Sequence, residues 1–278
     1  MSETDKKKTF LFDVKGTLID DELSYMSPIL VECFKRLKER GHRLGLSTAQ
    51  STSELKKFIV EDLKLDLDFF DAGIILEDGH VRVPVGGDWD NARIMTAGSA
   101  LDEMKSFTQV FQENWIPAED ETLAQNGWGF LKGAPKVPIQ LAPDKLAPVG
   151  SVTIWELDDA SEATSDTVAL QNHLQILLDN NDLTNIEVTD GGNGTLRVLE
   201  LMRDKSTDML RWGFNPAQML FIGNGNNDIS LAQTVSYFGG VVLAVKNSPE
   251  DLKDLADHVA DKDASDGTVD LLLDLLER

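Results

Sequence analysis

Residues 9–18 read TFLFDVKGTL, and this stretch decides the expected fold. Thr9–Val14 is a short apolar run, which is typical of a strand buried inside a parallel sheet. Asp13 lies at the end of that run, and a loop containing Gly16 follows. A carboxylate that leaves a buried strand into a tight glycine turn is surrounded by backbone N–H groups. That setting suits a nucleophile for phosphorus.

The segments on either side of a long central region alternate between strand and helix patterns. In the first half we expect a helix that begins at Ser27–Pro28 and stops at Gly41, a strand at Leu44–Leu46, a helix at Ser53–Leu63 and a strand at Ala72–Leu76. In the second half we expect a helix at Ser206–Trp212, a strand at Gln218–Ile222, a helix at Ile229–Val235, a strand at Val241–Val245 and a final helix from Thr268. This order predicts an α/β fold with a doubly wound parallel sheet.

Residues 82–203 differ from the rest and predict an inserted α+β domain. They contain most of the tryptophans and prolines, together with loop-rich stretches. The elements predicted there are a strand at Ser151–Leu157, a helix at Thr167–Leu178 and strands at Ile186–Thr189 and Thr195–Leu201. We therefore expect one domain made of 1–81 and 204–278, with 82–203 forming an inserted cap.

The composition excludes several classes of protein. The net charge of −22, from 26 basic and 48 acidic residues, argues against a nucleic-acid partner. The acidity fits either general solubility or a salty cytoplasm, where like charges repel less. The longest apolar run, Tyr237–Val245, contains two glycines and is too short for a membrane span. With its polar N-terminus, MSETDKKK, the chain is expected to be cytoplasmic. A single cysteine, Cys33, excludes an internal disulfide.

Four separated segments carry groups suited to phosphate chemistry, and each lies at or near a predicted strand end, where open parallel sheets bind ligands. They are Asp13 with its glycine turn, the hydroxyl pair Ser47 and Thr48, the cation Lys205, and the amide-rich loop 223–228. Each has a simpler local explanation, such as a turn former, a helix cap or a surface lysine. Together, in this order, they indicate a phosphate site.

These motifs resemble those of the haloacid dehalogenase superfamily. Residues 13–17 match its Asp-x-Asp-Gly-Thr motif except at Lys15, and residues 223–228 match its Gly-Asp-x-x-Asn-Asp motif except at Asn224. Thr48 and Lys205 match its second and third motifs. Glu77-Asp78-Gly79, the tail Val241–Val259 with Asn247, and the position of the cap resemble the Cof-type subfamily, which includes sucrose-phosphate phosphatases.

The resemblance implies a role for each matched residue. The residues implied to take part in catalysis are Asp13 as nucleophile, Lys15, Thr48 and Lys205. Those implied to contact phosphate are Asp13, Gly16, Thr17, Ser47, Thr48 and Lys205. Those implied to hold Mg²⁺ are Asp13, the backbone carbonyl of Lys15, Asn224 and Asp228. The implied substrate is a small phosphorylated metabolite of the sugar-phosphate class.

Two departures from the family pattern change the expected chemistry. Lys15 replaces the aspartate that protonates the leaving group, and an ammonium group is a poor acid near neutral pH. Asn224 replaces a metal-binding aspartate, so one negative charge is lost and weaker Mg²⁺ binding is expected. Lys15 either supplies part of the metal's charge by pairing with Asp13 or Asp228, or points into solvent.

Three functions follow as alternatives. The first is a phosphatase, slowed by Lys15 and suited to good leaving groups. The second is a phosphometabolite-binding or regulatory protein that does not catalyse hydrolysis. The third is cleavage of a different bond. In the cap, Trp115, Trp128 and Trp155 either stack on a sugar or pack in the core.

Overall fold

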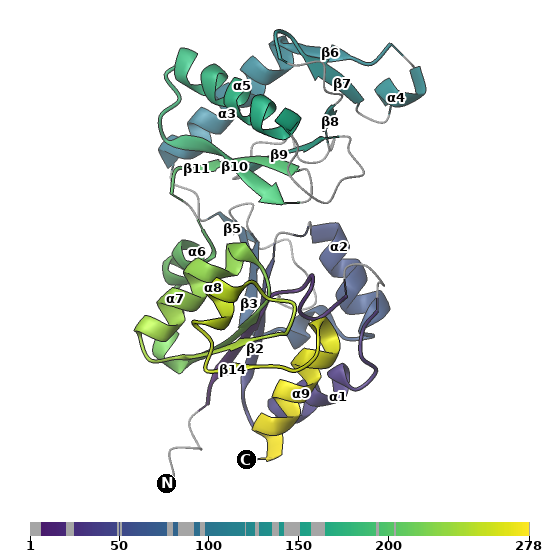
Figure 1. The fold of residues 1–278 in the computed structure, drawn as a ribbon, viewed down its shortest axis with the longest axis vertical. Coiled ribbons are helices and arrows are strands. Elements are labelled where there is room, and N and C mark those ends of the chain that lie inside the picture. Colours follow the sequence, from purple (N-terminus) through teal and green to yellow (C-terminus); the bar gives the residue numbers. More distant parts are fainter. Residues whose placement is uncertain are drawn as a thin grey trace. The chain divides into compact units, whose positions relative to one another are not determined.

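The computed structural model describes residues 7–20, 25–48, 50, 52–76, 80–82, 92–94, 98–119, 121–125, 128–134, 139–141, 151–156, 165–192, 195–202 and 204–277. The Glu77-Asp78-Gly79 turn lies outside these residues. The chain divides into two compact units, Met1–Arg93 with Asp204–Arg278, and Ile94–Arg203 (Figure 1). The first division falls later than the boundary expected at residue 82.

The first unit is built on a sheet whose central strands are parallel, which confirms the doubly wound α/β class. Its strand order is β14 (His258–Val259), β13 (Val241–Ala244), β12 (Met219–Gly223), β1 (Thr9–Phe12), β2 (Arg43–Thr48), β3 (Gly73–Leu76), β4 (His80–Arg82) and β5 (Ala92–Ile94). Strands β14 to β3 run parallel, and β4 is antiparallel to β3. β1 pairs with β2 on one side and β12 on the other, so it lies in the middle of the parallel strands.

Helices cover both faces of this sheet. Figure 1 shows α6 (Lys205–Trp212), α7 (Ile229–Tyr237) and α8 (Glu250–Lys253) together on one side, and α1 (Leu30–Glu39) and α9 (Ala264–Glu277) together on the other. The remaining helical segments of this unit are α2 (Thr52–Lys57), the π-helical turn Phe58–Asp62 and the 3₁₀ turns Leu67–Phe69, Pro216–Gln218 and Asn226–Asp228. Strand residues alternate between the two faces, as the pleat of a strand requires.

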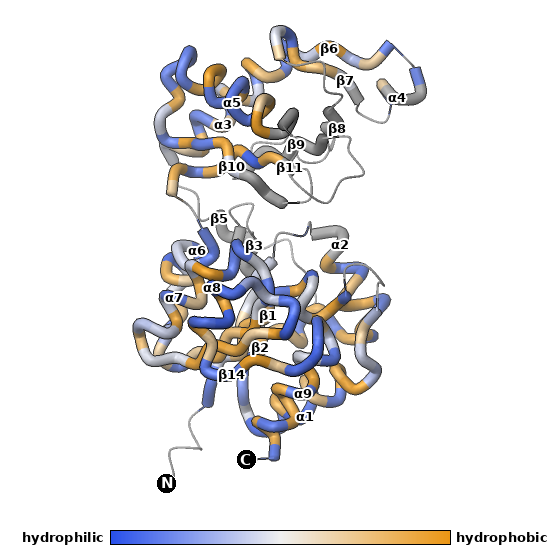
Figure 2. The backbone as a smooth tube through the Cα atoms, viewed as in Figure 1, coloured by the Kyte–Doolittle hydropathy of each residue, from blue (hydrophilic) through white to orange (hydrophobic). Residues whose placement is uncertain are grey.

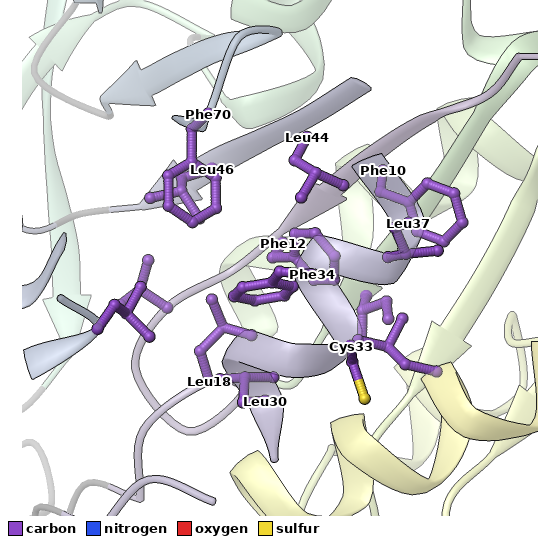
Figure 3. Close-up of a cluster of buried hydrophobic side chains, with 14 of the residues drawn as sticks. Phe10, Phe12, Leu18, Leu30, Cys33, Phe34, Leu37, Leu44, Leu46 and Phe70 are labelled. Atoms are coloured by element: carbon purple, nitrogen blue, oxygen red, sulfur yellow. The ribbon is translucent and has the colours of Figure 1, made fainter. Parts of the chain in front are cut away.

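The larger of the two cores lies between the sheet and α1, α2 and α9. Phe10 and Phe12 of β1 face this side, and Figure 3 shows them with Phe34 of α1 and Phe70. The Phe34 ring is 5.1 Å from the Phe12 ring and 5.8 Å from the Phe70 ring, centroid to centroid. Cys33 is buried in the same cluster, and this burial raises the pKa of its thiol. Hydrophobic residues accordingly fill the middle of the unit, where β1 and β2 lie (Figure 2).

The structure confirms the predicted end of α1 but not its predicted N-cap. The helix stops as expected at Gly41, which adopts a φ of +82° that favours glycine. The prediction of Ser27 as the N-cap is wrong, because the N-cap is Ile29 and has no side-chain cap. The backbone N–H of Ser27 instead donates to Ser265 Oγ at 2.8 Å, which ties the start of α1 to α9.

The second unit is an antiparallel sheet with helices packed against it. Its strand order is β10 (Ile186–Gly192), β11 (Thr195–Glu200), β9 (Ser151–Glu156), β8 (Ile139–Leu141), β7 (Trp128–Leu131) and β6 (Trp115–Pro117). α3 (Gly98–Glu113) and α5 (Ser165–Asn180) bury their apolar faces against β10 and β11, and α4 (Glu121–Gln125) is short. Trp115 stacks on Phe111 at 5.7 Å, so it belongs to this core. Within the described parts of both units, no helix has the length and apolarity needed to cross a bilayer.

The aromatic cluster predicts a large effect of truncating Phe34. Phe34→Ala should lower the free energy of unfolding by about 3–5 kcal/mol, because it leaves a cavity between β1 and α1. Urea unfolding followed by circular dichroism measures this loss. Lys35→Ala is the matched control on the exposed side of the same helix and should change stability by less than about 0.5 kcal/mol. Equal losses in the two variants would contradict the assigned core.

Candidate active site

The site forms where three neighbouring parallel strands end. β1 is followed by Asp13, β2 ends at Ser47 and Thr48, and β12 leads into the loop that contains Asn224. The backbone N–H of Asp13 donates to Ile222 O at 2.9 Å, so β1 stays paired with β12 up to the functional residue. The carboxyl ends of parallel strands meet at one edge of a sheet, and the structure places Asp13 in the middle of that edge.

A buried lysine connects two carboxylates at this edge. Lys205 Nζ lies 2.8 Å from Asp13 Oδ1 and 2.6 Å from Asp228 Oδ1. The exposed fractions are 1% for Lys205, 6% for Asp13 and 0% for Asp228. Burying a charge is costly unless it is paired and hydrogen-bonded, and here each charge has a partner. Lys205 therefore fixes Asp13 and Asp228 relative to each other.

The start of α6 positions Lys205. The preceding residue, Asp204, is the N-cap, and its Oδ1 accepts hydrogen bonds from Thr207 N and Ser206 Oγ, both at 2.7 Å. Burial raises the pKa of the Asp204 carboxyl, but the hydrogen bonds from Thr207, Ser206 and Ser230 outweigh it, so the pKa is lowered overall. The cap thus stays ionised and holds the first turn of α6, from which Lys205 extends into the site.

Both carboxylate oxygens of Asp228 accept hydrogen bonds from other residues of the protein. While Oδ1 accepts from Lys205, Oδ2 accepts from the backbone N–H groups of Asn224 and Gly225, both at 2.9 Å. Gly223 is required by this turn, because a Cβ there would lie 2.6 Å from Asp228 Oδ2. The Asp228 carboxylate therefore holds the loop after β12 in its turn conformation.

Residues near the C-terminus hold the loop after β1. Gly16 has a φ of +72°, and its carbonyl accepts from Asn247 Nδ2 at 3.0 Å. The carbonyl of Thr17 accepts from Thr268 Oγ1 at 2.8 Å. The prediction that the last helix starts at Thr268 is wrong, because α9 begins at Ala264, and no motif in the sequence marks Thr268 as a support of this loop. In the sequence, Asn247 is marked only as part of the tail that resembles the Cof-type subfamily.

The Asn224 side chain lies against the same loop. Its amide is oriented by its neighbours, because oxygen and nitrogen of a carboxamide are assigned from the hydrogen bonds they form. With Nδ2 facing the loop, it donates to Lys15 O at 2.7 Å, Thr17 Oγ1 at 2.9 Å and Asp13 Oδ2 at 3.1 Å. A Cβ on Gly16 would come within 2.8 Å of Asn224 Cγ, so the close approach requires glycine.

This arrangement does not fit the Mg²⁺ site that the resemblance implies. Mg²⁺ is bound by oxygen atoms in a near-ideal octahedron. The Asn224 amide makes favourable contacts with Asp13 and Lys15 O only when its nitrogen faces them, an orientation assigned from these contacts, and both Asp228 oxygens accept hydrogen bonds from the protein. Among the described residues, no group of three or more His, Cys, Asp and Glu side chains is placed to hold a metal ion.

Lys15 does not take part in the buried ion pairs. Its side chain is exposed, and within the described parts of the chain it forms no ion pair with Asp13 or Asp228. The suggestion that Lys15 pairs with one of these carboxylates is therefore wrong. Lys205 is the cation that joins them, while Lys15 faces solvent, as the second alternative held.

At the end of β2, Thr48 makes a side-chain hydrogen bond and Ser47 makes one through its backbone carbonyl. Thr48 Oγ1 accepts from Gln50 N at 3.1 Å, a local turn that leaves its hydroxyl hydrogen available to donate. Ser47 contributes its carbonyl oxygen to Lys205 Nζ at 3.4 Å. The Ser47 hydroxyl is buried and has no hydrogen-bond partner among the residues that the structure describes. Both residues thus lie at the site edge, but only the Ser47 backbone contacts Lys205.

Comparison with known proteins agrees with this geometry. A family model described as haloacid dehalogenase-like hydrolase matches residues 10–124 and 144–272. The chain belongs to this family. The match includes Asp13, Thr48, Lys205 and the loop after β12, the segments that meet at the sheet edge. Comparison with curated protein sequences gives no match.

Solved structures of other haloacid dehalogenase proteins share the fold of both units. A haloacid dehalogenase-like hydrolase from Bacteroides thetaiotaomicron is 17% identical, with a TM-score of 0.65, and the match covers 97% of this chain and 100% of that one. A phosphatase of the superfamily from the same organism is 16% identical, with a TM-score of 0.63, over 100% and 97%. A subclass IIB sugar phosphatase is 14% identical, with a TM-score of 0.52, over 91% and 93%.

The buried ion pairs predict that removing the Lys205 ammonium destabilises this haloacid dehalogenase-like protein. Lys205→Met leaves two buried carboxylates without their cation and should lower the free energy of unfolding by about 3–5 kcal/mol. Thermal and urea unfolding measure the loss. In the double variant Lys205→Met with Asp228→Asn, one of the carboxylates is also removed, and part of the stability should return. If the double variant is less stable than Lys205→Met, the lysine does not stabilise through Asp228.

Proposed function

We propose that the protein is a phosphatase of a small phosphorylated metabolite, in the sugar-phosphate class, and that it works through an aspartyl-phosphate at Asp13. The observation that carries this proposal is the contact of 2.8 Å between Lys205 Nζ and Asp13 Oδ1 at the end of a central strand. Membership of the hydrolase family and the fold shared with a subclass IIB sugar phosphatase support it.

The proposed reaction has two steps. An Asp13 carboxylate oxygen attacks phosphorus, the bond from phosphorus to the leaving-group oxygen breaks, and the phosphoryl group is transferred to Asp13. Water then attacks the phosphoryl group, which releases inorganic phosphate and restores the carboxylate. Lys205, which already contacts Asp13, lies where its positive charge can offset the charge that builds up on the phosphoryl oxygens.

The net charge of −22 makes local cations necessary for binding an anionic substrate. Lys205 is buried beside the nucleophile, and Lys15 is exposed in the loop that follows it. Thr17 lies in the same loop, with its hydroxyl 3.4 Å from Asp13 Oδ2. We assign phosphate binding to these groups together with the Gly16 turn, Ser47 and Thr48.

Proton supply to the leaving group is the weak point of the proposed reaction. Lys15 occupies the position from which the family's acid would act, and an exposed ammonium is a poor proton donor near neutral pH. Leaving groups that depart without a proton are affected least. We therefore expect acyl and aryl phosphates to be hydrolysed faster than sugar phosphates.

Replacement of the nucleophile tests the reaction. Asp13→Asn should lower hydrolysis of aryl phosphate and acyl phosphate by on the order of 10⁴-fold, because the amide cannot form the phosphoenzyme. Mass spectrometry of acid-quenched protein should detect a phosphoryl adduct in the wild type and none in the variant. Asp66→Asn, an exposed position in the same unit, is the matched control and should retain activity. A wild type that binds phosphate but hydrolyses neither aryl phosphate nor acyl phosphate would instead indicate a binding protein.

Replacement of Lys15 tests the missing acid. Lys15→Asp should raise the turnover of a sugar phosphate by about 10²–10⁴-fold and change that of acyl phosphate little, because only the poorer leaving group needs a proton. Steady-state assays on both substrates measure the two effects. Lys15→Ala removes the ammonium without adding a carboxyl and should give no such gain. A similar gain in both variants would show that the positive charge of Lys15, and not the absent acid, limits the rate.

A further inference from the structure

The most unusual group in the site is the Asn224 carboxamide. One of its two terminal atoms faces three oxygens at once, namely Lys15 O at 2.7 Å, Thr17 Oγ1 at 2.9 Å and Asp13 Oδ2 at 3.1 Å. Were this atom the amide oxygen, it would face the lone pairs of a carbonyl and a carboxylate with no hydrogen between them. With nitrogen in that place, two N–H groups are shared among the three oxygens, and the contacts become favourable.

The spacing of these atoms matches both hydrogen bonds and the ligand shell of a small cation. Neighbouring oxygens around an octahedral Mg²⁺ with bonds of about 2.1 Å are about 3.0 Å apart. The Asn224 atom lies at 2.7 and 3.1 Å from Lys15 O and Asp13 Oδ2, which is close to that spacing. A cation would join such atoms from a point between them, whereas the amide joins them directly through its hydrogens.

We propose that the Asn224 carboxamide replaces a divalent cation as the link between the Asp13 carboxylate and the Lys15 carbonyl. The loop after β1 and the loop after β12 are then held together without metal. The inference rests on hydrogen-bond geometry in the described residues, so it stands whether or not the protein is a phosphatase.

The charges in the site explain why an amide can do this and a carboxylate cannot. Asp13 and Asp228 share the single ammonium of Lys205. A third carboxylate at position 224 would place an oxygen about 3.1 Å from Asp13 Oδ2, with no proton between the two. Like charges at that distance repel strongly in a buried site, and only an added cation would offset the repulsion. The neutral amide avoids the repulsion and supplies its own donors.

The test compares wild type with Asn224→Asp. Thermal unfolding is measured with excess EDTA and with millimolar Mg²⁺, and Mg²⁺ affinity is measured by isothermal titration calorimetry. Wild-type Tm should be the same in both solutions. Asn224→Asp should have a lower Tm in EDTA, regain stability with Mg²⁺, and bind Mg²⁺ at least about tenfold more tightly, because a ligand charge has been added.

Asn226→Asp is the matched control. It makes the same chemical change at an exposed position of the same loop and should leave the response to Mg²⁺ unchanged. Should Asn224→Asp fail to fold, wild type alone decides the question: the side-chain NH₂ signals of Asn224 in NMR spectra should be protected from exchange and insensitive to Mg²⁺. A wild-type Tm that rises with Mg²⁺ as much as that of Asn224→Asp, or NH₂ signals displaced by Mg²⁺, would overturn the proposal.

Discussion

The buried ammonium of Lys205 is the interaction on which the site depends. It lies at the start of α6, after the second unit, yet its partners are Asp13 after β1 and Asp228 after β12. A lysine that is 1% exposed is stabilised there by two carboxylates that compensate its charge. Lys205 likewise stabilises Asp228, because a fully buried carboxylate would lower the stability of the fold if its charge were not compensated. The ion pairs of Lys205 therefore connect the two sequence segments that form the first unit, one with Asp13 and the other with Asp228.

Hydrogen bonds from the C-terminal part of the chain complete this constraint. Asn247 donates to the Gly16 carbonyl and also accepts from Ala264 N at 2.9 Å, so it joins the loop after β1 to the start of α9. Thr268, on that same helix, holds the Thr17 carbonyl. These supports restrict the loop beside Asp13, the proposed nucleophile, which favours a preorganised site over one assembled on binding. They also explain why α9, a helix far from Asp13 in sequence, affects the position of this residue.

Local patterns predicted the fold where the signal was short-range. The apolar run after Thr9, the stop at Gly41 and the alternation of strands and helices all have local physical causes, and the first unit follows them. α3 was not among the predicted elements, although Ala100, Met104, Phe107 and Phe111 recur at helical spacing. Motif spacing also gathered Asp13, Lys205 and Asn224 correctly at one sheet edge. It could not show which lysine joins the carboxylates, or which way an amide faces, because both depend on contacts between residues far apart in the chain.

The two departures from the family pattern complement each other electrostatically. Asp13, Asp228 and Lys205 together carry one net negative charge, which would repel a phosphate dianion. A divalent cation would reverse that sign, but the proposed link through Asn224 removes the need for one. Lys15, exposed in the adjacent loop, is placed to add positive charge for the proposed phosphorylated substrate. If position 224 had changed alone, the site would have lost cation affinity and gained nothing for the anion. With both changes, attraction of phosphate to the proposed site would depend on buried Lys205 and exposed Lys15, and added salt should weaken mainly the contribution of Lys15, because buried charges are screened less.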